Sequence, residues 1–179
     1  MIIWLNGAFG AGKTQTAYEL QRRLKSIYVY DPENAGYFIC KNIPTELSKN
    51  DFQDYPMWRT FNLSMLSYIA EHHAGDIIVP MTITNRRYYD ELVGELSRTW
   101  EVRHFILYAE RAVLLRRLAS RFEGRNSWGA QQIDRCLRAF DTEITEQKIH
   151  TDSLSIREAA EQVAALAGLT LPPDQRSGL

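Results

Sequence analysis

The sequence predicts a three-layer α/β protein, in which a five-stranded parallel sheet carries helices on both faces. Three observations predict this class. Five apolar runs alternate with stretches whose apolar residues recur every three or four positions, and such alternation implies crossover connections and a parallel sheet. The runs are apolar throughout, as expected of strands covered on both faces. A glycine-rich loop joins the first run to the first helical stretch.

The expected strands are short and rich in β-branched and aromatic residues. They cover residues 1–5, 27–30, 77–79, 102–108 and 148–151. Apolar periodicity predicts a helix after the glycine loop and further helices over residues 55–72, 87–99, 112–121, 130–140 and 156–167. We expect Asp152 or Ser153 to cap the last helix and Gly168 to end it.

Length and composition indicate one domain without a membrane span. The chain has 179 residues, and we place the domain at residues 1–170 and a tail at 171–179. The net charge of −1 gives no bulk attraction to nucleic acid, so no nucleic-acid partner is expected. The chain opens directly into its first strand, without the features of a signal peptide, and no apolar run approaches about 20 residues. We therefore expect a cytoplasmic protein.

Residues 7–14 read GAFGAGKT and fit the phosphate-loop pattern G-x-x-x-x-G-K-[ST] at every fixed position. Glycines let the backbone curl closely around an anion, and the loop N–H groups and the helix N-terminus then point at a phosphate chain. Lys13 adds a charge for the outer phosphates, and the Thr14 hydroxyl is placed to ligate Mg²⁺. A chance glycine-rich turn is the alternative, and the flanking strand and helix argue against it. The nucleotide-binding residues predicted here are Gly7, Ala8, Phe9, Gly10, Ala11, Gly12, Lys13, Thr14 and Gln15.

Polar residues follow the other predicted strands, at the carboxyl edge where parallel sheets bind ligands. Asp31 ends the second strand, with Glu33 close behind, and Thr82 ends the third. All three are predicted to contact the substrate. Asp31 would face the γ-phosphate, where a carboxylate can accept a proton from a substrate hydroxyl or hold a magnesium-bound water. The alternative is that Asp31 only begins an Asp-Pro turn.

The magnesium assignment has two forms because the third strand lacks the acidic residue that usually ends a magnesium-binding strand. Either Thr82 binds the metal through water, or Asp31 takes that role. At the end of the fifth strand, Asp152 occupies a corner that commonly flanks the nucleotide base, so we predict a nucleotide contact there. It can equally cap the following helix.

Arg117, Arg121 and Arg125 lie four residues apart, so the first two share a helix face. Arginine forks match phosphate oxygens. Such a cluster beside a phosphate loop suits a lid, placed at about residues 117–130, that closes over the nucleotide and stabilises transferred charge. We expect Arg117 and Arg121 to contact the nucleotide, and Arg121 and Arg125 to act in catalysis. A solvated helix face is the alternative, and we prefer it for Arg116.

An aromatic-rich stretch at about residues 33–74 would close over a second substrate. Aromatic faces can stack on a base or a sugar, and Arg59 can meet an anionic group. Trp58 and Arg59 are both candidates for the substrate site. They are adjacent in sequence, so at most one of them is expected to face the ligand. Most of the other rings, Phe61 among them, are expected in the core.

Six segments, in order along nearly the whole chain, resemble the tunicamycin-resistance proteins. They are WLNGAFGAGKTQTAY at 4–18, YVYDPE at 28–33, IVPMTI at 78–83, NSW at 126–128, QIDRC at 132–136 and TDSLSI at 151–156. The resemblance implies an ATP-binding protein that protects a cell against tunicamycin, a uracil nucleoside that carries amino sugars and a fatty acyl chain. It also implies a P-loop kinase fold close to the nucleoside-monophosphate, shikimate and gluconate kinases, with an arginine lid. Longer family members continue into a basic segment associated with membranes. This chain stops at Leu179, which argues against membrane association.

The leading functional hypothesis is a small-molecule kinase that uses ATP and Mg²⁺. In it, Lys13 and Thr14 hold the nucleotide, Asp31 activates a hydroxyl of tunicamycin or of a related nucleoside or sugar, and the arginines stabilise the moving phosphoryl group. Two alternatives are ATP-dependent sequestration of the drug without chemistry and a housekeeping nucleoside or sugar kinase. A regulatory NTPase is disfavoured because the acidic end of the magnesium strand is missing.

Overall fold

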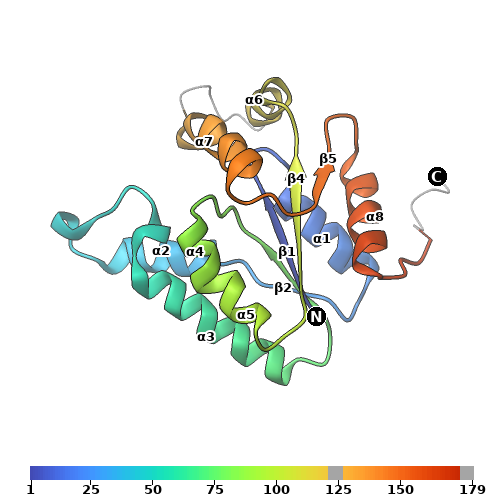
Figure 1. Cartoon of the computed structure of the whole chain (residues 1–179), viewed down its shortest axis with the longest axis horizontal. Coiled ribbons are helices and arrows are strands. Elements are labelled where there is room, and N and C mark those ends of the chain that lie inside the picture. Colours follow the sequence, from blue (N-terminus) through green and yellow to red (C-terminus); the bar gives the residue numbers. More distant parts are fainter. Residues whose placement is uncertain (121–126, 174–179) are drawn as a thin grey trace.

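The computed structural model describes residues 1–120 and 127–173, and it confirms the predicted fold class. Five parallel strands form one sheet in the order β2-β3-β1-β4-β5 (Figure 1). The strands are β1 Ile2–Gly7, β2 Tyr28–Val29, β3 Ile77–Pro80, β4 Val102–Tyr108 and β5 Lys148–His150. β1 lies at the centre, where all six of its residues are buried, because it pairs with β3 on one side and β4 on the other.

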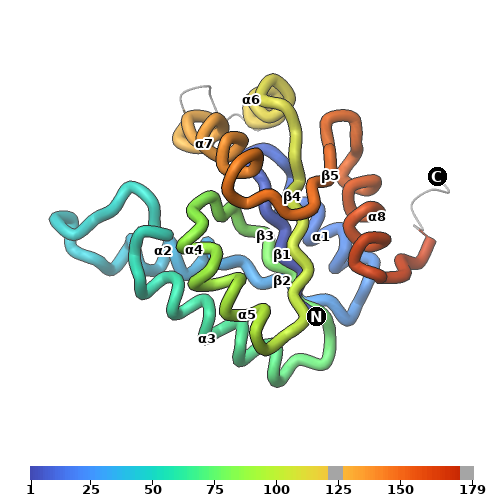
Figure 2. The backbone as a smooth tube through the Cα atoms, in the orientation of Figure 1, coloured from blue at the N-terminus to red at the C-terminus, as the bar shows by residue number. Residues whose placement is uncertain are grey.

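Helices cover both faces of this sheet. They are α1 Lys13–Arg23, α2 Glu33–Asn42, α3 Pro56–His72, α4 Arg86–Tyr89, α5 Glu95–Ser97, α6 Arg111–Ala119, α7 Trp128–Thr142 and α8 Ile156–Ala167. A π-helical turn, Asp90–Gly94, joins α4 to α5, and two 3-10 turns, Thr45–Leu47 and Phe52–Asp54, precede α3. Figure 1 shows α1 and α8 on one side of the sheet and α2 to α5 on the other. In Figure 2 the five strands form a layer between these two groups of helices.

The ends of α8 confirm one capping prediction and correct another. Gly168 ends the helix in the left-handed conformation, as predicted. The N-cap, however, is Ser155, whose hydroxyl accepts the Glu158 N–H while the Glu158 carboxylate reaches back to the Ser155 N–H. This reciprocal pair satisfies two N–H groups at the helix start, so the predicted caps Asp152 and Ser153 are wrong. Asp152 accepts a hydrogen bond from the Glu110 N–H instead, at 2.7 Å.

In the aromatic-rich stretch at about residues 33–74, the helices differ in two respects from those predicted. α2 was not predicted, because the aromatic residues Tyr37 and Phe38 are exposed and Gly36 is its only fully buried residue, so no apolar stripe marks the helix. In α3 the buried positions include Trp58, Asn62 and Leu66, each four residues after the last. Phe61 lies off this face and is 51% exposed, so its assignment to the core is wrong.

None of the helices within residues 1–120 and 127–173 combines the length and the apolar character that a membrane crossing needs. The predicted lid and tail fall partly outside these ranges. Figure 1 shows α6 and α7 beyond the carboxyl end of β4, so the helices that flank the predicted lid stand at the edge of the sheet where the glycine loop also lies.

Candidate active site

The loop between β1 and α1 depends on three glycines. Gly7, Gly10 and Gly12 have φ angles of 144°, 85° and 95°, which side chains of L-residues rarely adopt. A Cβ atom at Gly7 would lie 2.5 Å from the Leu107 carbonyl oxygen, and one at Gly10 would lie 3.0 Å from the Leu114 carbonyl oxygen. The chain can therefore make this close turn only where glycine is present.

The start of α1 offers backbone donors to an anion. The N-cap Gly12 has no side chain to bond the first turn, and that turn carries no acidic residue. The first N–H groups of a helix lack acceptors within the helix, and the helix dipole adds positive character there. Thr14 and Gln15 are exposed at this end. The described loop therefore ends in a helix N-terminus whose backbone N–H groups suit phosphate oxygens.

Lys13 is held inside this loop. Its side chain is buried, with the residue 9% exposed, and Nζ donates to the carbonyl oxygens of Gly7 at 3.0 Å and Ala8 at 3.1 Å. The ammonium group also lies 5.6 Å from the centre of the Phe9 ring. A buried charge needs such partners, and phosphate binding by Lys13 stays a prediction.

The segment after β3 is fastened to the loop by polar side chains. The Thr82 hydroxyl donates to the Gly7 carbonyl oxygen at 2.7 Å. Asn6, fully buried in β1, donates through Nδ2 to the Ile83 carbonyl at 2.8 Å, and its Oδ1 accepts the N–H groups of Gly7 and Ile83. Sequence reasoning missed Asn6. An amide inside an otherwise apolar strand was the available signal, because a buried amide must be hydrogen-bonded.

A pocket of about 410 Å³ opens beside the loop. We call it the aromatic pocket, because Phe9, Tyr37, Phe52 and Trp128 line it. Phe9 meets Trp128 edge to face at a centroid distance of 5.1 Å, and Tyr37 meets Phe52 at 6.2 Å. Phe9 belongs to the phosphate loop, so the pocket and the loop share a wall.

The polar lining of the aromatic pocket is acidic or neutral. It consists of Glu33, Asn50, Asp51 and Gln53. Glu33, a predicted substrate residue, accepts the Tyr37 hydroxyl at 2.8 Å. Although the Tyr37 residue is 60% exposed, partial desolvation of its phenol, together with this hydrogen bond, raises the pKa of Tyr37 to about 12. A phenol is protonated at neutral pH even at its ordinary pKa of about 10, so Tyr37 can donate to Glu33.

Asp31, the predicted base, follows β2 and is half-buried. Its Oδ1 accepts the Glu33 N–H at 3.0 Å, and its carbonyl oxygen accepts the Asn34 N–H. This is the Asp-Pro turn that the sequence offers as the alternative to a functional role. The turn uses only one carboxylate oxygen in these bonds, so it is compatible with the catalytic prediction, which stays a prediction.

A smaller pocket of about 310 Å³ lies on the other side of the loop, where Gly10, Gly12, Gln15 and Arg117 meet the start of α8. Arg117 Nη1 donates to the Thr151 hydroxyl at 3.1 Å, and Nη2 donates to the Thr151 carbonyl. The structure therefore places Arg117 beside the phosphate loop, and its contact with a nucleotide stays a prediction. Asp152 is not among the residues that line this pocket.

Trp58 and Arg59 are both internal. Trp58 is fully buried, and its Nε1 donates to the Pro32 carbonyl at 3.0 Å. Arg59, 5% exposed, binds the Gln53 carbonyl through Nη1 and the Glu91 carboxylate through Nε. Neither residue lines the aromatic pocket. They support the segment that forms it.

Arg121 and Arg125 lie outside the described residues. Within the described part of the chain, no group of three or more His, Cys, Asp or Glu side chains could hold a metal ion. Magnesium ligation by Thr14 and Asp31 stays a prediction.

Arg59 provides a stability test with a built-in control. Arg59 and the exposed Arg87 both bind the Glu91 carboxylate, and they hold the pKa of Glu91 below its usual value. Arg59→Met should lower the free energy of unfolding by about 2 kcal/mol, because the buried Gln53 carbonyl loses a charged donor. Arg87→Met should cost less than about 0.5 kcal/mol, as expected of an exposed ion pair. Urea denaturation of both variants is the measurement, and equal losses would contradict this assignment.

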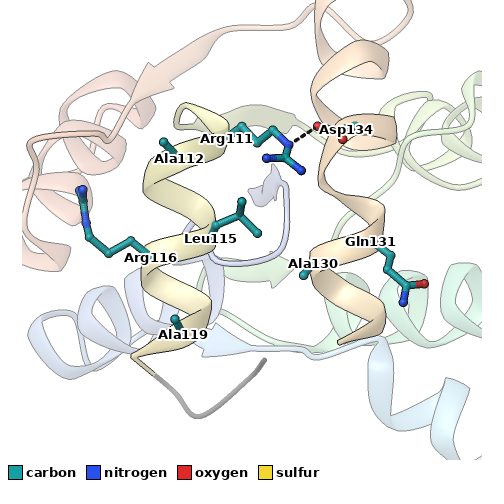
Figure 3. Close-up of a pocket in the computed structure, with 8 residues that line it drawn as sticks. All are labelled: Arg111, Ala112, Leu115, Arg116, Ala119, Ala130, Gln131 and Asp134. Carbon is teal, nitrogen blue, oxygen red and sulfur yellow. Dashed lines mark hydrogen bonds and ion pairs between the residues drawn. The ribbon is translucent and has the colours of Figure 1, made fainter. Parts of the chain in front are cut away.

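A further pocket, of about 880 Å³, lies between α6 and α7 and includes none of the phosphate-loop residues. Figure 3 shows the ion pair between Arg111 and Asp134 bridging the two helices, at 2.8 Å, with Leu115 and Ala130 between them. Arg116 points away from α7 in this view, which agrees with a solvated role for that residue. Two described pockets border the phosphate loop, one through Phe9 and the other through Gly10, Gly12 and Gln15. We place the candidate site for a second ligand at the aromatic pocket, because aromatic rings line it beside the loop.

The known proteins that this chain resembles are solved structures that share its fold. No model of a protein family matches the chain, and no curated protein matches it. Among solved structures, the tunicamycin resistance protein of Deinococcus radiodurans has a TM-score of 0.81 and 37% sequence identity, over 97% of this chain and 98% of that one.

Two more distant structures share the fold. Shikimate kinase from Bacteroides thetaiotaomicron has a TM-score of 0.64 and 20% identity, over 94% of this chain and 99% of that one. The Mycobacterium tuberculosis APS kinase, solved with AMPPNP and APS, has a TM-score of 0.60 and 18% identity, over 93% and 96% of the two chains. These likenesses show a P-loop kinase fold.

Proposed function

Because the chain belongs to the tunicamycin-resistance protein family, we propose that it is a magnesium-dependent phosphotransferase that transfers the γ-phosphoryl group of ATP to a hydroxyl of tunicamycin or of a related nucleoside or sugar. The observation that carries the proposal is the shared wall between the phosphate loop and the aromatic pocket, formed by Phe9. A triphosphate that lies on the loop would end beside a second ligand in the pocket. This proximity is what phosphoryl transfer requires.

The loop supplies the nucleotide side. Backbone N–H groups of residues 8–15 would bind the phosphate oxygens, and Lys13 would turn from the Gly7 and Ala8 carbonyls to the outer phosphates. Thr14, exposed at the start of α1, would ligate Mg²⁺, which when bound neutralises part of the phosphate charge. Arg117, beside the loop, would add a guanidinium group, and Arg121 and Arg125 would join it from the predicted lid.

The charge of the aromatic pocket supports a neutral acceptor. Its described lining contains two carboxylates, Glu33 and Asp51, and neither Lys nor Arg. Asp51 is paired with Arg135 at 3.4 Å, so Glu33 is the carboxylate that disfavours an acceptor already carrying a phosphate, such as a nucleoside monophosphate. Four aromatic rings instead suit the face of a base or a sugar ring. A neutral nucleoside with sugar hydroxyls, such as tunicamycin, fits both properties.

Asp31 is the proposed base. It follows β2 at the carboxyl edge of the sheet and is tied to the first turn of α2 through the Glu33 N–H, so its backbone is fixed close to the acidic side of the aromatic pocket. From there the carboxylate would take the proton of the acceptor hydroxyl as the oxygen attacks the γ-phosphorus and the bond to the ADP oxygen breaks.

Mass spectrometry tests the transfer. The protein is incubated with tunicamycin, ATP and Mg²⁺, and the drug should gain the mass of one phosphate group while ADP appears in equal amount. Asp31→Asn should reduce the transfer rate by roughly 10²–10⁴-fold and leave nucleotide and drug binding intact. Asp134→Asn is the matched control and should leave the transfer rate unchanged, because it makes the same substitution at an exposed carboxylate that pairs with Arg111 and lines neither pocket beside the loop.

ATP-dependent sequestration is the second candidate. It is favoured by one observation: the residue that follows β3 at the loop is Thr82, whose hydroxyl donates to the Gly7 carbonyl, rather than an acidic residue. Sequestration predicts tight, nucleotide-dependent drug binding, release of unmodified drug, and an Asp31→Asn variant that still protects cells. ADP release measured over a panel of nucleosides and sugars separates a housekeeping kinase from both.

A further inference from the structure

The carbonyl oxygen of Gly7 accepts hydrogen bonds from two side chains, those of Lys13 and Thr82. The Lys13 ammonium donates to it at 3.0 Å, and the Thr82 hydroxyl donates to it at 2.7 Å. Gly7, Lys13 and Thr82 are all buried. The two donors therefore share one acceptor in a buried site, where a polar group without a hydrogen-bond partner destabilises the protein.

Nucleotide binding by the proposed mechanism changes only one of these bonds. Lys13 must leave the Gly7 and Ala8 carbonyls to reach the outer phosphates. The Gly7 oxygen then loses the ammonium but keeps the hydroxyl. Without the hydroxyl, that oxygen would lose both side-chain donors, and the lysine would be held more strongly on the loop.

We propose that Thr82 is a positioning residue that keeps the Gly7 carbonyl hydrogen-bonded while Lys13 moves to the phosphates, and so favours nucleotide binding. The inference rests on the proposed nucleotide site and assigns to Thr82 a role different from the substrate contact predicted for it. In this role Thr82 acts through Lys13, so it affects the binding only of ligands that contact Lys13.

Thr82 is held rigidly enough for this role. The residue is 4% exposed, and its carbonyl accepts the Gln53 Nε2 at 2.8 Å. On either side of it, the Met81 carbonyl accepts the Trp4 indole N–H at 3.0 Å, and Ile83 is bonded to the Asn6 side chain. A β-branched residue with a fixed backbone has few rotamers, so the hydroxyl stays directed at Gly7.

The test compares the affinities for ADP and AMP, because AMP lacks the outer phosphates that Lys13 would meet. Dissociation constants are measured by competition against a fluorescent ATP analogue. In Thr82→Val, ADP should bind about tenfold more weakly, which corresponds to the loss of about one buried hydrogen bond, while AMP binding stays within about twofold. Thr82→Ser keeps the hydroxyl and should restore ADP binding. Thr84→Val removes a hydroxyl of the same size two residues away and should change neither affinity.

A double-mutant cycle makes the assignment specific. In a Lys13→Met background, Thr82→Val should have no further effect on ADP affinity, because the lysine whose movement it assists is gone. The inference is overturned if Thr82→Val weakens ADP and AMP equally, if it leaves ADP unchanged, or if its effect persists without Lys13. Circular dichroism and thermal melting confirm that each variant is folded. Failure of the unaltered chain to bind ADP would overturn the proposed function together with this inference, whereas normal binding with an unchanged ADP-to-AMP ratio overturns the inference alone.

Discussion

Replacing Lys13 by Met should slow phosphoryl transfer on the order of 10³-fold, which is the loss expected when one donor to developing transition-state charge is removed. The side chain is the only lysine or arginine of the phosphate-loop segment 7–14, and its Nζ is already placed within the loop, 3.0 Å from Gly7 O. Methionine keeps the length and packing of the chain without the charge. Initial rates of ADP formation in the presence of tunicamycin are the measurement.

The control for this experiment is Lys25→Met. Lys25 is exposed in the turn after α1, so the same change of charge is made away from the site, and its rate should equal that of the unaltered protein. Equal rates for Lys13→Met and Lys25→Met, with both proteins folded, would remove Lys13 from the catalytic proposal.

The largest stability effect is expected at Gly7. Gly7→Ala should lower the free energy of unfolding by roughly 3–5 kcal/mol, since it combines an unfavourable φ angle with a steric clash. The φ angle is 144°, and the new Cβ would lie 2.5 Å from the Leu107 carbonyl oxygen. That oxygen belongs to β4, which pairs with the central strand β1, so it cannot move without disturbing the sheet. Urea denaturation gives the value.

Gly94→Ala is the matched substitution. Gly94 has a helical φ of −60°, and the nearest atom to a new Cβ there is at 3.8 Å, in ordinary contact. Alanine should stabilise the protein at this position by about 0.5–1 kcal/mol. If both variants lost the same stability, or if Gly7→Ala lost none, the described conformation of the loop would be wrong.

The elements that could be predicted are those with strong local signals. The strand at residues 102–108 and the helix at 156–167 have the predicted bounds, because their apolar patterns follow the period of the structure. The helix α2 could not be found in this way, since its aromatic residues face away from the core. Phe61 was misplaced because helical spacing alone does not say which of two apolar faces meets the sheet.

In the candidate site, too, features with a local sequence signal could be predicted and contacts between distant segments could not. The phosphate loop could be identified from sequence because its glycines, lysine and threonine are contiguous. Contacts between distant segments could not: the bond from Thr82 to Gly7 spans 75 positions, and those from Asn6 to Ile83 span 77. Arg59 illustrates the difficulty, because a lone arginine among aromatic residues suggested an anion contact, whereas its partners are Glu91 and the Gln53 carbonyl.

Isothermal titration calorimetry of the unaltered protein with a non-hydrolysable ATP analogue and Mg²⁺ tests the central claim most directly. If residues 7–14 hold a triphosphate, the titration should saturate at one nucleotide per chain, with a dissociation constant of roughly 1 μM to 1 mM, the usual range for a substrate of this kind. Protein that is folded by circular dichroism yet gives no saturable heat would contradict the nucleotide site and the transfer that depends on it.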